Sequence, residues 1–524
     1  MNRNNLPIFF AIAVCFGILI GVFFNGQTNF LNKNSSSEQK IKRLINFIQQ
    51  DYVDEVNTDK LLDGAIAQML TKLDPHSVYI PKENLQAVTE SMQGNFVGIG
   101  VQFRMIEDSL TVIQPIKGGP SIRKGILAGD RILMADQDTL VGKKLRSNDI
   151  LKTLKGQPGT EVNLQVYRKS NDSLFNVIVK RGKVNIKSVD VAYMLNDNVG
   201  YIKLDRFAQN TYREFKSSLD DLLDKGMTDL VLDLRGNGGG FIHIANKIVD
   251  EFLEDDKLIV YTKNNGGDIN KSYATEKGSF EKGGLYVLID ENSASASEIV
   301  AGALQDNDKG NIIGRRSFGK GLVQEEMDLG DGSAVRLTIA RYYTPTGRSI
   351  QKPYKEENDT SETTNYSAEV ENRYRNGELF SKDSIKTIDS LKFTTPKGKI
   401  VYGGGGIVPD VFVPVDTSQY ISPFYFSHLN NFAFEYVDNN RKKLNEISLD
   451  DFVQNFDNNN NVSDNFFNKI KDFNASARTK TRLKKLLKTA IARELFSDEG
   501  LYRLNHIDDK MIQKVLELDK SKQE

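Results

Sequence analysis

The pattern of apolar and polar residues changes its period several times along the chain, and each period predicts a different kind of element. Residues 6–24 form an uninterrupted, uncharged apolar run that is long enough to span a bilayer. Arg3 precedes this run, and no convincing small-x-small cleavage site follows it. The pattern therefore predicts a single-pass membrane anchor over 1–25, with a removed signal peptide as the alternative. The basic residue favours a cytoplasmic N-terminus and places the rest of the chain on the outer side of a plasma membrane.

From 26 to 90 the pattern changes to a polar tether followed by two amphipathic helices. Apolar side chains recur at helical spacing in 38–53 and again in 59–73, which gives each stretch one apolar face. We expect these helices to form a small helical element that packs on the rest of the chain.

Short apolar runs with glycine-containing turns predict a β-rich domain over 91–183, with a helix at 148–154. From 184 to 418 strands and helices alternate, which predicts a largely buried α/β sheet. The expected strands are 199–204, 230–234, 285–290, 311–314 and 335–343, and the expected helices are 211–225, 242–253 and 298–306. The polar stretch 354–392 is expected to be an exposed insertion, and 419–524 to be a helical C-terminal extension.

The composition limits the number of domains and the kinds of function that this chain can have. The 524 residues are too many for one core and predict two to four domains. A net charge of −1 gives no sign of nucleic acid binding. The only cysteine, Cys15, lies within the first apolar run, so the part of the chain outside the membrane is expected to form no disulfide. Histidines number only four, so a serine-based hydrolase here needs another base.

Small hydroxyl residues mark the most informative stretch of the chain. Ser293, Ser295 and Ser297 alternate with alanines where the strand at 285–290 passes into the helix at 298–306. Free backbone N–H groups and the positive end of the helix dipole are available at such a position to stabilise an oxyanion. The alternative is that Ser295 and Glu298 only form a helix capping box.

A lysine that can serve as a base follows this helix. If 320–324 is extended, Lys320 and Gln324 project on the same face, because side chains alternate along a strand. A solvated surface lysine between two turn glycines is the alternative.

Taken together, these motifs resemble the carboxyl-terminal processing, or tail-specific, serine proteases, which use a Ser/Lys dyad. The resemblance rests on SASASEI at 293–299, FGKGLVQ at 318–324, DLRGNGGG at 233–240 and TPTGRSIQ at 344–351, and it covers roughly 40–415. It implies that Ser295 is the nucleophile, Lys320 the base and Gln324 the residue that orients the lysine. Spacing alone does not separate the three serines, so Ser293 and Ser297 remain alternative nucleophiles.

The resemblance also implies an oxyanion hole made by the backbone N–H groups of Gly239 and Ala296. The glycine-rich stretch 235–240 lacks the lysine of a phosphate-binding loop, which argues against a nucleotide site. His243 allows a Ser/His/Asp alternative. An ordinary lysine is protonated at neutral pH, so Lys320 has to lose its charge by burial among apolar neighbours before it can take a proton. Attack by Ser295 would then give an acyl-enzyme that water hydrolyses.

Residues 95–181 look like a PDZ domain. The segment Phe96–Phe103 is a glycine-containing turn that leads into a strand, and such a turn leaves backbone N–H groups free for a terminal carboxylate. We expect Gly98, Ile99 and Gly100 to contact that carboxylate. Ile150 and Leu154, on the predicted helix, are expected to line the pocket for an apolar side chain. The implied partner is a polypeptide with a free, apolar C-terminus.

The sequence thus predicts a multidomain α/β protein with an anchor, a helical segment, a PDZ domain, a protease core of the ClpP/crotonase type and a helical extension. The favoured function is a membrane-anchored serine endopeptidase without metal or cofactor. A catalytically silent peptide-binding protein and a crotonase-like acyl-transfer enzyme are the alternatives. An adaptor or a homo-oligomer is a possible partner, and nucleic acid is not expected.

Overall fold

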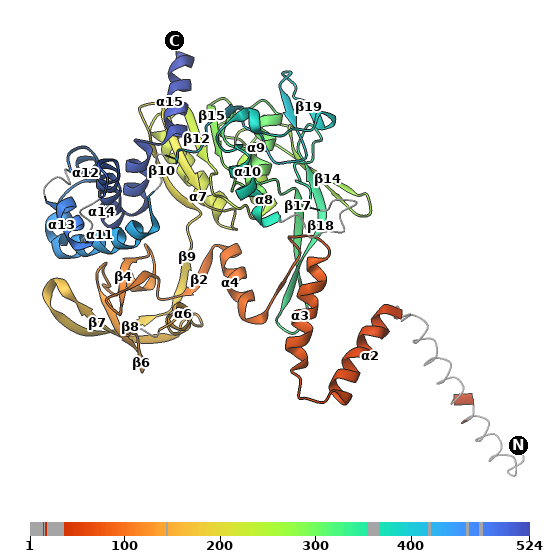
Figure 1. Ribbon diagram of the computed structural model, residues 1–524, viewed down its shortest axis with the longest axis horizontal. Coiled ribbons are helices and arrows are strands. Elements are labelled where there is room, and N and C mark those ends of the chain that lie inside the picture. Colours follow the sequence, from red (N-terminus) through yellow and green to blue (C-terminus); the bar gives the residue numbers. More distant parts are fainter. Residues whose placement is uncertain are drawn as a thin grey trace, which may run out of the picture. The chain divides into compact units, whose positions relative to one another are not determined.

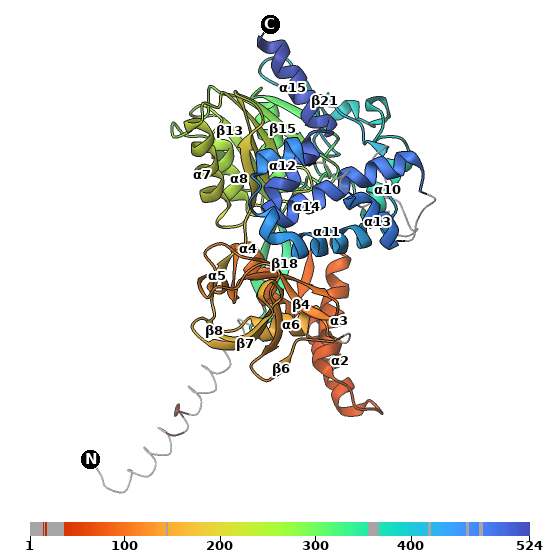
Figure 2. The same cartoon turned by 90° about the vertical axis from the view of Figure 1, so that its left-hand side faces the viewer.

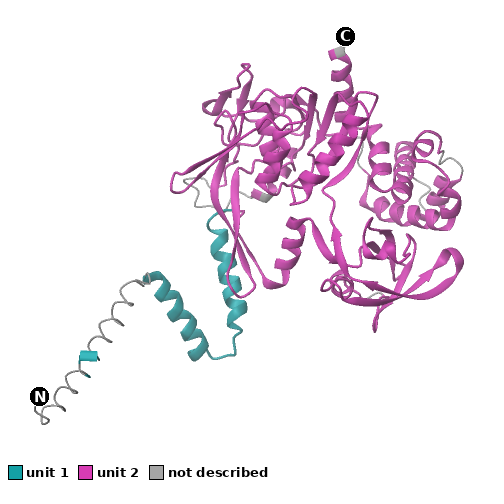
Figure 3. Ribbon diagram, turned by 180° about the vertical axis from the view of Figure 1, so that it is seen from behind, with its two compact units in different colours: residues 1–74 teal, residues 75–524 magenta. Residues whose placement is uncertain are grey.

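The computed structural model describes residues 14, 16–17, 36–142, 145–354, 366–417, 421–456, 461–470 and 475–523. It divides the chain into two compact units, 1–74 and 75–524, which are coloured separately in Figure 3. The two predicted amphipathic helices of the first unit are confirmed as α2 (Ser36–Asp51) and α3 (Thr58–Thr71). The side chain of Asn57 caps α3, because it accepts a hydrogen bond from the backbone N–H of Lys60 at 3.0 Å.

The predicted membrane anchor requires correction. None of the helices within the described ranges combines the length and the apolar character needed to cross a bilayer. This finding overturns the expected location as a single-pass protein of the plasma membrane. The run at 6–24 lies almost entirely outside the described residues. An apolar sequence meets only one requirement for a span, since the backbone must also form a continuous helix of about 20 residues.

The second unit begins with β1 (Val78–Ile80) and α4 (Lys82–Gln93), and a β-rich domain follows. The main strands of this domain form an antiparallel sheet in the order β3-β4-β5-β7-β8, and β6 pairs with β5. Their bounds are β3 (Val101–Ile106), β4 (Ser109–Pro115), β5 (Arg131–Ala135), β6 (Asp138–Thr139), β7 (Glu161–Arg168) and β8 (Ser173–Lys180). Two helices, α5 (Pro120–Arg123) and α6 (Ser147–Leu154), complete the domain. An antiparallel ribbon of β2 (Asn95–Gly98) and β9 (Gly182–Asn185) joins its two ends.

The predicted α/β sheet is confirmed as a six-stranded sheet in the order β10-β11-β12-β15-β16-β21. Strand β10 is antiparallel to β11, and the other neighbours are parallel. The strands are β10 (Val189–Met194), β11 (Val199–Leu204), β12 (Asp229–Asp233), β15 (Gly284–Ile289), β16 (Asn311–Gly314) and β21 (Val411–Phe412). The crossover helices are α7 (Thr211–Asp224), α8 (Ile242–Asp250) and α9 (Ala296–Asp306).

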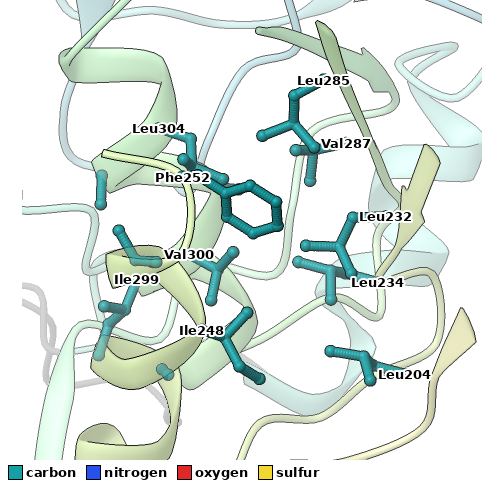
Figure 4. Close-up of a cluster of buried hydrophobic side chains, with 14 of the residues drawn as sticks. Leu204, Leu232, Leu234, Ile248, Phe252, Leu285, Val287, Ile299, Val300 and Leu304 are labelled. Carbon is teal, nitrogen blue, oxygen red and sulfur yellow. The ribbon is translucent and has the colours of Figure 1, made fainter. Parts of the chain in front are cut away.

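These helices share one hydrophobic core with one face of the sheet. Figure 4 shows Leu232 and Val287 from the strands facing Ile248 and Val300 from the helices, and all four side chains are fully buried. Continuous apolar strands of this kind are typical of parallel sheets that are covered on both faces.

The opposite face of the sheet is covered by the end of the chain. Helix α15 contributes Ile512 and Val515 to a second buried cluster with Tyr201 and Val231 of the strands. The C-terminal helices are α11 (Pro423–Leu444), α12 (Leu449–Asn455), α13 (Val462–Ile470), α14 (Ala477–His506) and α15 (Lys510–Gln523). Helices α11 to α14 also enclose a core of their own, and Figures 1 and 2 show them, in blue, as one cluster. The predicted helical extension is therefore part of the protease core as well as a separate bundle.

A second sheet stands beside the first and consists of β1, β18, β13 and β14 in that order, with β17 paired to β18. All its pairings are antiparallel. Its further strands are β13 (Leu258–Asn264), β14 (Ile269–Tyr273), β17 (Leu322–Asp328) and β18 (Ala334–Tyr343), and β19 (Lys392–Thr394) pairs separately with β20 (Ile400–Tyr402).

The composition of the polar stretch 354–392 predicted an exposed insertion, but part of this stretch is buried. Its helix α10 (Glu369–Arg375) carries Arg373, which is only 2% exposed. The Arg373 guanidinium donates to the carbonyl oxygen of Ser317 at 3.0 Å and forms an ion pair with Glu378 at 2.8 Å. Charged residues can be buried when each is paired, and composition does not reveal such pairing.

The burial of α15 predicts that the end of the chain stabilises the protease core. Replacing Ile512, which is 1% exposed, by alanine is expected to lower the free energy of unfolding by about 2–5 kcal/mol, because it leaves a cavity beneath the sheet. The matched control is Ile507→Ala, because Ile507 is 57% exposed and its loss should cost no more than about 0.5 kcal/mol. Thermal unfolding of the full chain measures both, and equal melting temperatures for the two variants would contradict this role for α15.

Candidate active site

The candidate site is built where two neighbouring strands end. Strands β12 and β15 are parallel neighbours, so the loops that follow them meet at one edge of the sheet. The backbone N–H of Ala294 donates to the carbonyl oxygen of Asn237 at 3.0 Å, and the N–H of Gly236 donates to the Asp290 carboxylate at 2.9 Å. These bonds hold the glycine-rich loop 235–240 against the serine-containing loop 290–295.

The three serines of the second loop have different surroundings. Ser293 and Ser297 are completely buried, and their hydroxyls donate to the backbone carbonyls of Leu234 and Asn237 at 2.8 and 2.9 Å. Both therefore bind the two loops together. Ser295 is half-buried and adopts a φ of +56°, an uncommon value for a residue other than glycine. It stands at the N-cap of α9, where strand passes into helix.

Gly239 lies directly against Ser295. Its φ is +101°, and a Cβ added there would stand 2.7 Å from the Cβ of Ser295 and 2.9 Å from the backbone nitrogen of Ala296. Only glycine permits this approach. Ala296 is the first residue of α9, so its N–H has no partner within the helix. The N–H of Gly239 donates to the side-chain oxygen of Asn237 at 2.9 Å.

Glu298 lies at the centre of the site and has no exposed surface. Its carboxylate accepts four hydrogen bonds, from the backbone N–H groups of Ser295 (2.9 Å), Gly319 (2.7 Å) and Lys320 (2.8 Å) and from the hydroxyl of Ser317 (2.5 Å). Burial raises the pKa of Glu298 to about 7, although the four donors act in the opposite direction. The sequence suggested a helix cap, and the bond to Ser295 fits that pattern. The other three bonds come from a segment about twenty residues further along the chain, which local sequence cannot indicate.

A tyrosine provides a second connection between the serine and lysine segments. The hydroxyl of Tyr342, a residue only 1% exposed, lies 3.2 Å from the carbonyl oxygen of Ser295 and 2.5 Å from that of Lys320. Sequence reasoning placed this residue only on a strand. A tyrosine in an apolar strand gives no local sign that its hydroxyl reaches two loops.

The predicted relation between Lys320 and Gln324 stays a prediction. Lys320 is half-buried and lies two residues before β17 begins, and the pairing of β17 with β18 shifts register between Val323 and Gln324. The extra residue at this shift is Ile339 of β18, so β17 itself is not bulged. Lys320 lies outside β17, so alternation along that strand does not by itself set the direction of the Lys320 side chain. The amide of Gln324 donates to the hydroxyl of Thr338 at 3.4 Å.

The predicted peptide-contacting residues of the β-rich domain lie close together. Gly100 has a φ of +76° at the turn that precedes β3. Ile99, Ile150 and Leu154 belong to one buried cluster, and each is no more than 3% exposed. In this structure Ile150 and Leu154 are therefore part of the core of the domain and have almost no exposed surface. Strand β3 pairs with β4 on one side and lies at the edge of its sheet.

The remaining candidate from the sequence, His243, is not among the residues that bind Glu298 or Tyr342. His243 is exposed on α8, where its Nε2 lies 3.2 Å from the side-chain oxygen of Gln209. Another histidine, His76, is not a candidate from the sequence, and its Nε2 lies 2.9 Å from the hydroxyl of Tyr366. Across the described ranges no group of three or more His, Cys, Asp or Glu side chains is arranged to hold a metal ion.

The raised pKa of Glu298 predicts a pH-dependent contribution to stability. The folded chain binds this proton up to a pH of about 7 and the unfolded chain only up to about 4.5, so stability falls as pH rises through that window. Glu298→Gln removes this contribution. We expect the variant to lose less thermal stability than the wild type between about pH 5 and pH 8. Glu325→Gln, at an exposed position of β17, is the control and should keep the wild-type pH dependence. An unchanged pH dependence in Glu298→Gln would contradict the burial of an ionisable carboxyl group.

Comparison with known proteins assigns several segments of the chain to families. Residues 198–359 match peptidase family S41, and residues 97–179 match the PDZ domain. Residues 24–84 match the N-terminal domain of the activating protease CtpB, and residues 426–498 match a family of unknown function.

Curated relatives agree with these matches. The chain is 36% identical over 308 residues to a carboxy-terminal-processing protease of Bartonella bacilliformis, an alignment that covers 58% of this chain and 70% of the relative. It is 31% identical over 326 residues to the carboxy-terminal processing protease CtpB of Bacillus subtilis, with coverages of 61% and 67%. A solved photosystem II D1 C-terminal processing protease is 28% identical and matches 61% of this chain and 85% of its own, but with a TM-score of 0.35. The chain therefore belongs to peptidase family S41, as a carboxy-terminal processing serine protease that carries a PDZ domain.

Proposed function

We propose that this endopeptidase cuts peptide bonds with a Ser295/Lys320 dyad through an acyl-enzyme. The observation that carries the proposal is the double connection between the two residues. The Glu298 carboxylate accepts the backbone N–H groups of both, and the Tyr342 hydroxyl lies within hydrogen-bonding distance of both carbonyl oxygens. These shared partners of the two backbones support an approach of residues that are 25 positions apart in the sequence.

The surroundings of the serines favour Ser295 as the nucleophile. Ser293 and Ser297 are buried, and their hydroxyls already donate to backbone carbonyls. Ser295 is the half-buried member of the three, and its strained backbone presents it at the turn from strand to helix. Backbone strain of this kind is often found at catalytic residues.

Lys320 is proposed to take the proton of the Ser295 hydroxyl. It is half-buried, two positions before Leu322, which is only 2% exposed. Only the neutral amine can act as a base, so the proposal requires Lys320 to react in that form. Gln324 is proposed to orient this amine without adding a charge. The same lysine would then activate the water that hydrolyses the acyl-enzyme.

The oxyanion of the tetrahedral intermediate is proposed to accept hydrogen bonds from Gly239 and Ala296. The close approach of Gly239 to the Ala296 nitrogen supports this pairing. The Ala296 N–H lies in the first turn of α9, where the helix dipole favours negative charge.

Substrate selection is proposed to begin at the PDZ domain. A polypeptide with a free, apolar C-terminus would add to the edge strand β3, with its carboxylate at Gly98, Ile99 and Gly100. Ile150 and Leu154 would have to move slightly to admit a side chain, since both are buried here. The predicted relation of the core to the ClpP/crotonase type stays a prediction.

The dyad is tested with an unstructured polypeptide that ends in an apolar, free C-terminus. We expect the wild type to cut it, and Ser295→Ala and Lys320→Ala to lose at least about 10³-fold in kcat, because each removes a group that takes part in the bond-forming step. Ser293→Ala and Ser297→Ala are the matched controls and should retain measurable cleavage. Cleavage by Ser295→Ala at the wild-type rate would identify a different nucleophile.

Two adjacent glycines allow a matched test of the oxyanion hole. At Gly239 an added Cβ would meet Ser295 and Ala296, whereas at Gly238 it would meet no atom within 4 Å. We expect Gly239→Ala to lower kcat by about 10²–10³-fold, since it displaces one oxyanion donor, and Gly238→Ala to leave kcat within about twofold of the wild type. Steady-state cleavage of one quenched peptide measures both. Equal rates for the two variants would contradict the proposed role of Gly239.

A further inference from the structure

The loop before β17, residues 318–321, contains the proposed base, and two groups of residues bind its backbone. In the first group, the Glu298 carboxylate accepts two N–H groups of the loop, and the Tyr342 hydroxyl donates to the carbonyl oxygen of the lysine. The second group is Gln351 and Lys352, which follow β18 in the chain. Both are buried, with exposed fractions of 7% and 3%. The proposed mechanism gives neither residue of this second group a part.

Gln351 and Lys352 bind the backbone on each side of Lys320. The side-chain oxygen of Gln351 accepts the N–H of Gly321 at 2.8 Å, and the backbone N–H of Lys352 donates to the carbonyl oxygen of Gly319 at 3.0 Å. The Gln351 side chain also donates to the carbonyl oxygen of Lys352 at 2.8 Å, which fixes the orientation of its amide. The residues before and after Lys320 are therefore both held, and the direction in which the lysine side chain leaves the backbone depends on Gln351.

The amide of Gln351 faces a tyrosine from the polar stretch 354–392. Tyr366 begins a one-turn 3-10 helix, and its hydroxyl lies 3.4 Å from the side-chain nitrogen of Gln351 and 2.9 Å from Nε2 of His76. A distance of 3.4 Å is long for a hydrogen bond, so the bond to His76 is what fixes the hydroxyl. His76 lies 290 positions earlier in the chain, just before β1. Two segments outside the α/β sheet thus meet at Gln351.

The ring of Tyr366 makes a separate set of contacts with the same loop. It meets the ring of Phe318 edge to face, with 5.7 Å between the ring centroids. The Lys352 amine lies 3.7 Å from the centroid of the Phe318 ring and 4.0 Å from that of the Tyr366 ring, and it forms an ion pair with Glu369 at 2.9 Å. Contacts between a cation and an aromatic ring are strongest when they are removed from water. Because the ring and the hydroxyl have different partners, a phenylalanine at this position removes one set of contacts and keeps the other.

We propose that His76, Tyr366 and Gln351 form a positioning relay for the catalytic lysine. The His76 ring fixes the Tyr366 hydroxyl, the hydroxyl limits the orientation of the Gln351 amide, and the amide oxygen holds the N–H of the residue after Lys320. The relay restricts the directions open to the lysine side chain, so that its amine meets the nucleophilic hydroxyl in the geometry that proton transfer needs. None of the three residues touches the substrate. The inference rests on the proposed function, because it takes Lys320 as the base.

Two members of the relay lie outside the segment that matches peptidase family S41. That match covers residues 198–359, whereas His76 falls in the match to an N-terminal domain over 24–84 and Tyr366 lies beyond residue 359. The relay therefore gives the polar stretch 354–392 a task in catalysis that its composition does not indicate. It also gives the segment before β1 a task besides strand pairing.

The test measures cleavage of one quenched peptide by the full chain and by variants of the relay. We expect Tyr366→Phe to lower kcat by about 10–100-fold with KM within about twofold of the wild type, because a misplaced base slows bond formation without weakening substrate binding. His76→Leu should have the same effect. His76→Gln should keep kcat within about threefold of the wild type, since an amide can still form a hydrogen bond with the hydroxyl. The double variant Tyr366→Phe/His76→Leu should be no slower than the slower single variant, because both changes break the same connection.

The matched control is Tyr374→Phe, at a 52% exposed position of α10 in the same polar stretch, and it should keep the wild-type kcat. Thermal unfolding of each variant gives the folded fraction at the assay temperature. The relay is overturned if Tyr366→Phe keeps kcat within about twofold of the wild type, if the loss of rate equals the loss of folded protein, or if His76→Gln is as slow as His76→Leu. Lys320→Ala separates the two proposals. If it cuts at the wild-type rate, the proposed function fails and the relay fails with it, whereas an inactive Lys320→Ala beside fully active relay variants refutes the relay alone.

Discussion

The arrangement of the active site depends on one buried carboxylate. Glu298 has no exposed surface, and leaving a charge in such a place would be costly without full hydrogen bonding. The four donors that satisfy it come from the turn before α9 and from the loop before β17. Because one carboxylate accepts hydrogen bonds from both segments, the turn before α9 and the loop before β17 are held close together. It also helps to explain why Ser295 can keep a backbone conformation that is normally unfavourable, since strained residues persist only where their surroundings fix them.

The same sheet that positions these loops needs both of its faces covered. Helices α7, α8 and α9 cover one face, and α15 covers the other with Ile512 and Val515. The last helix of the chain is consequently part of the protease core. The insertion around Arg373 is also interlocked with the core, because its guanidinium binds the backbone of the loop that leads to Lys320. Segments that lie outside the match to peptidase family S41 are thus joined to it by buried contacts in the folded chain.

Two contacts fix the glycine-rich loop 235–240 in this structure. In this structure a proposed oxyanion donor is engaged by Asn237, and the loop that carries it is held through Arg235 by the C-terminal helices.

The sequence by itself determined the local elements and the chemistry of the motifs. The strand at 199–204, the crossover helices and the helical extension follow from apolar periodicity, which is a property of neighbouring residues. The family was indicated by four short motifs, and the matches to known proteins support it. Only the tertiary structure decided what depends on partners far apart in the chain. It brought the Glu298 carboxylate to the backbone N–H of Lys320, buried Arg373 in a polar stretch, put a bulge in β18 at the level of Gln324 and paired Glu494 of α14 with Arg104 of the PDZ domain. Long-range pairing of buried polar groups leaves no periodic pattern in the sequence, because the two partners come into contact only when the chain has folded.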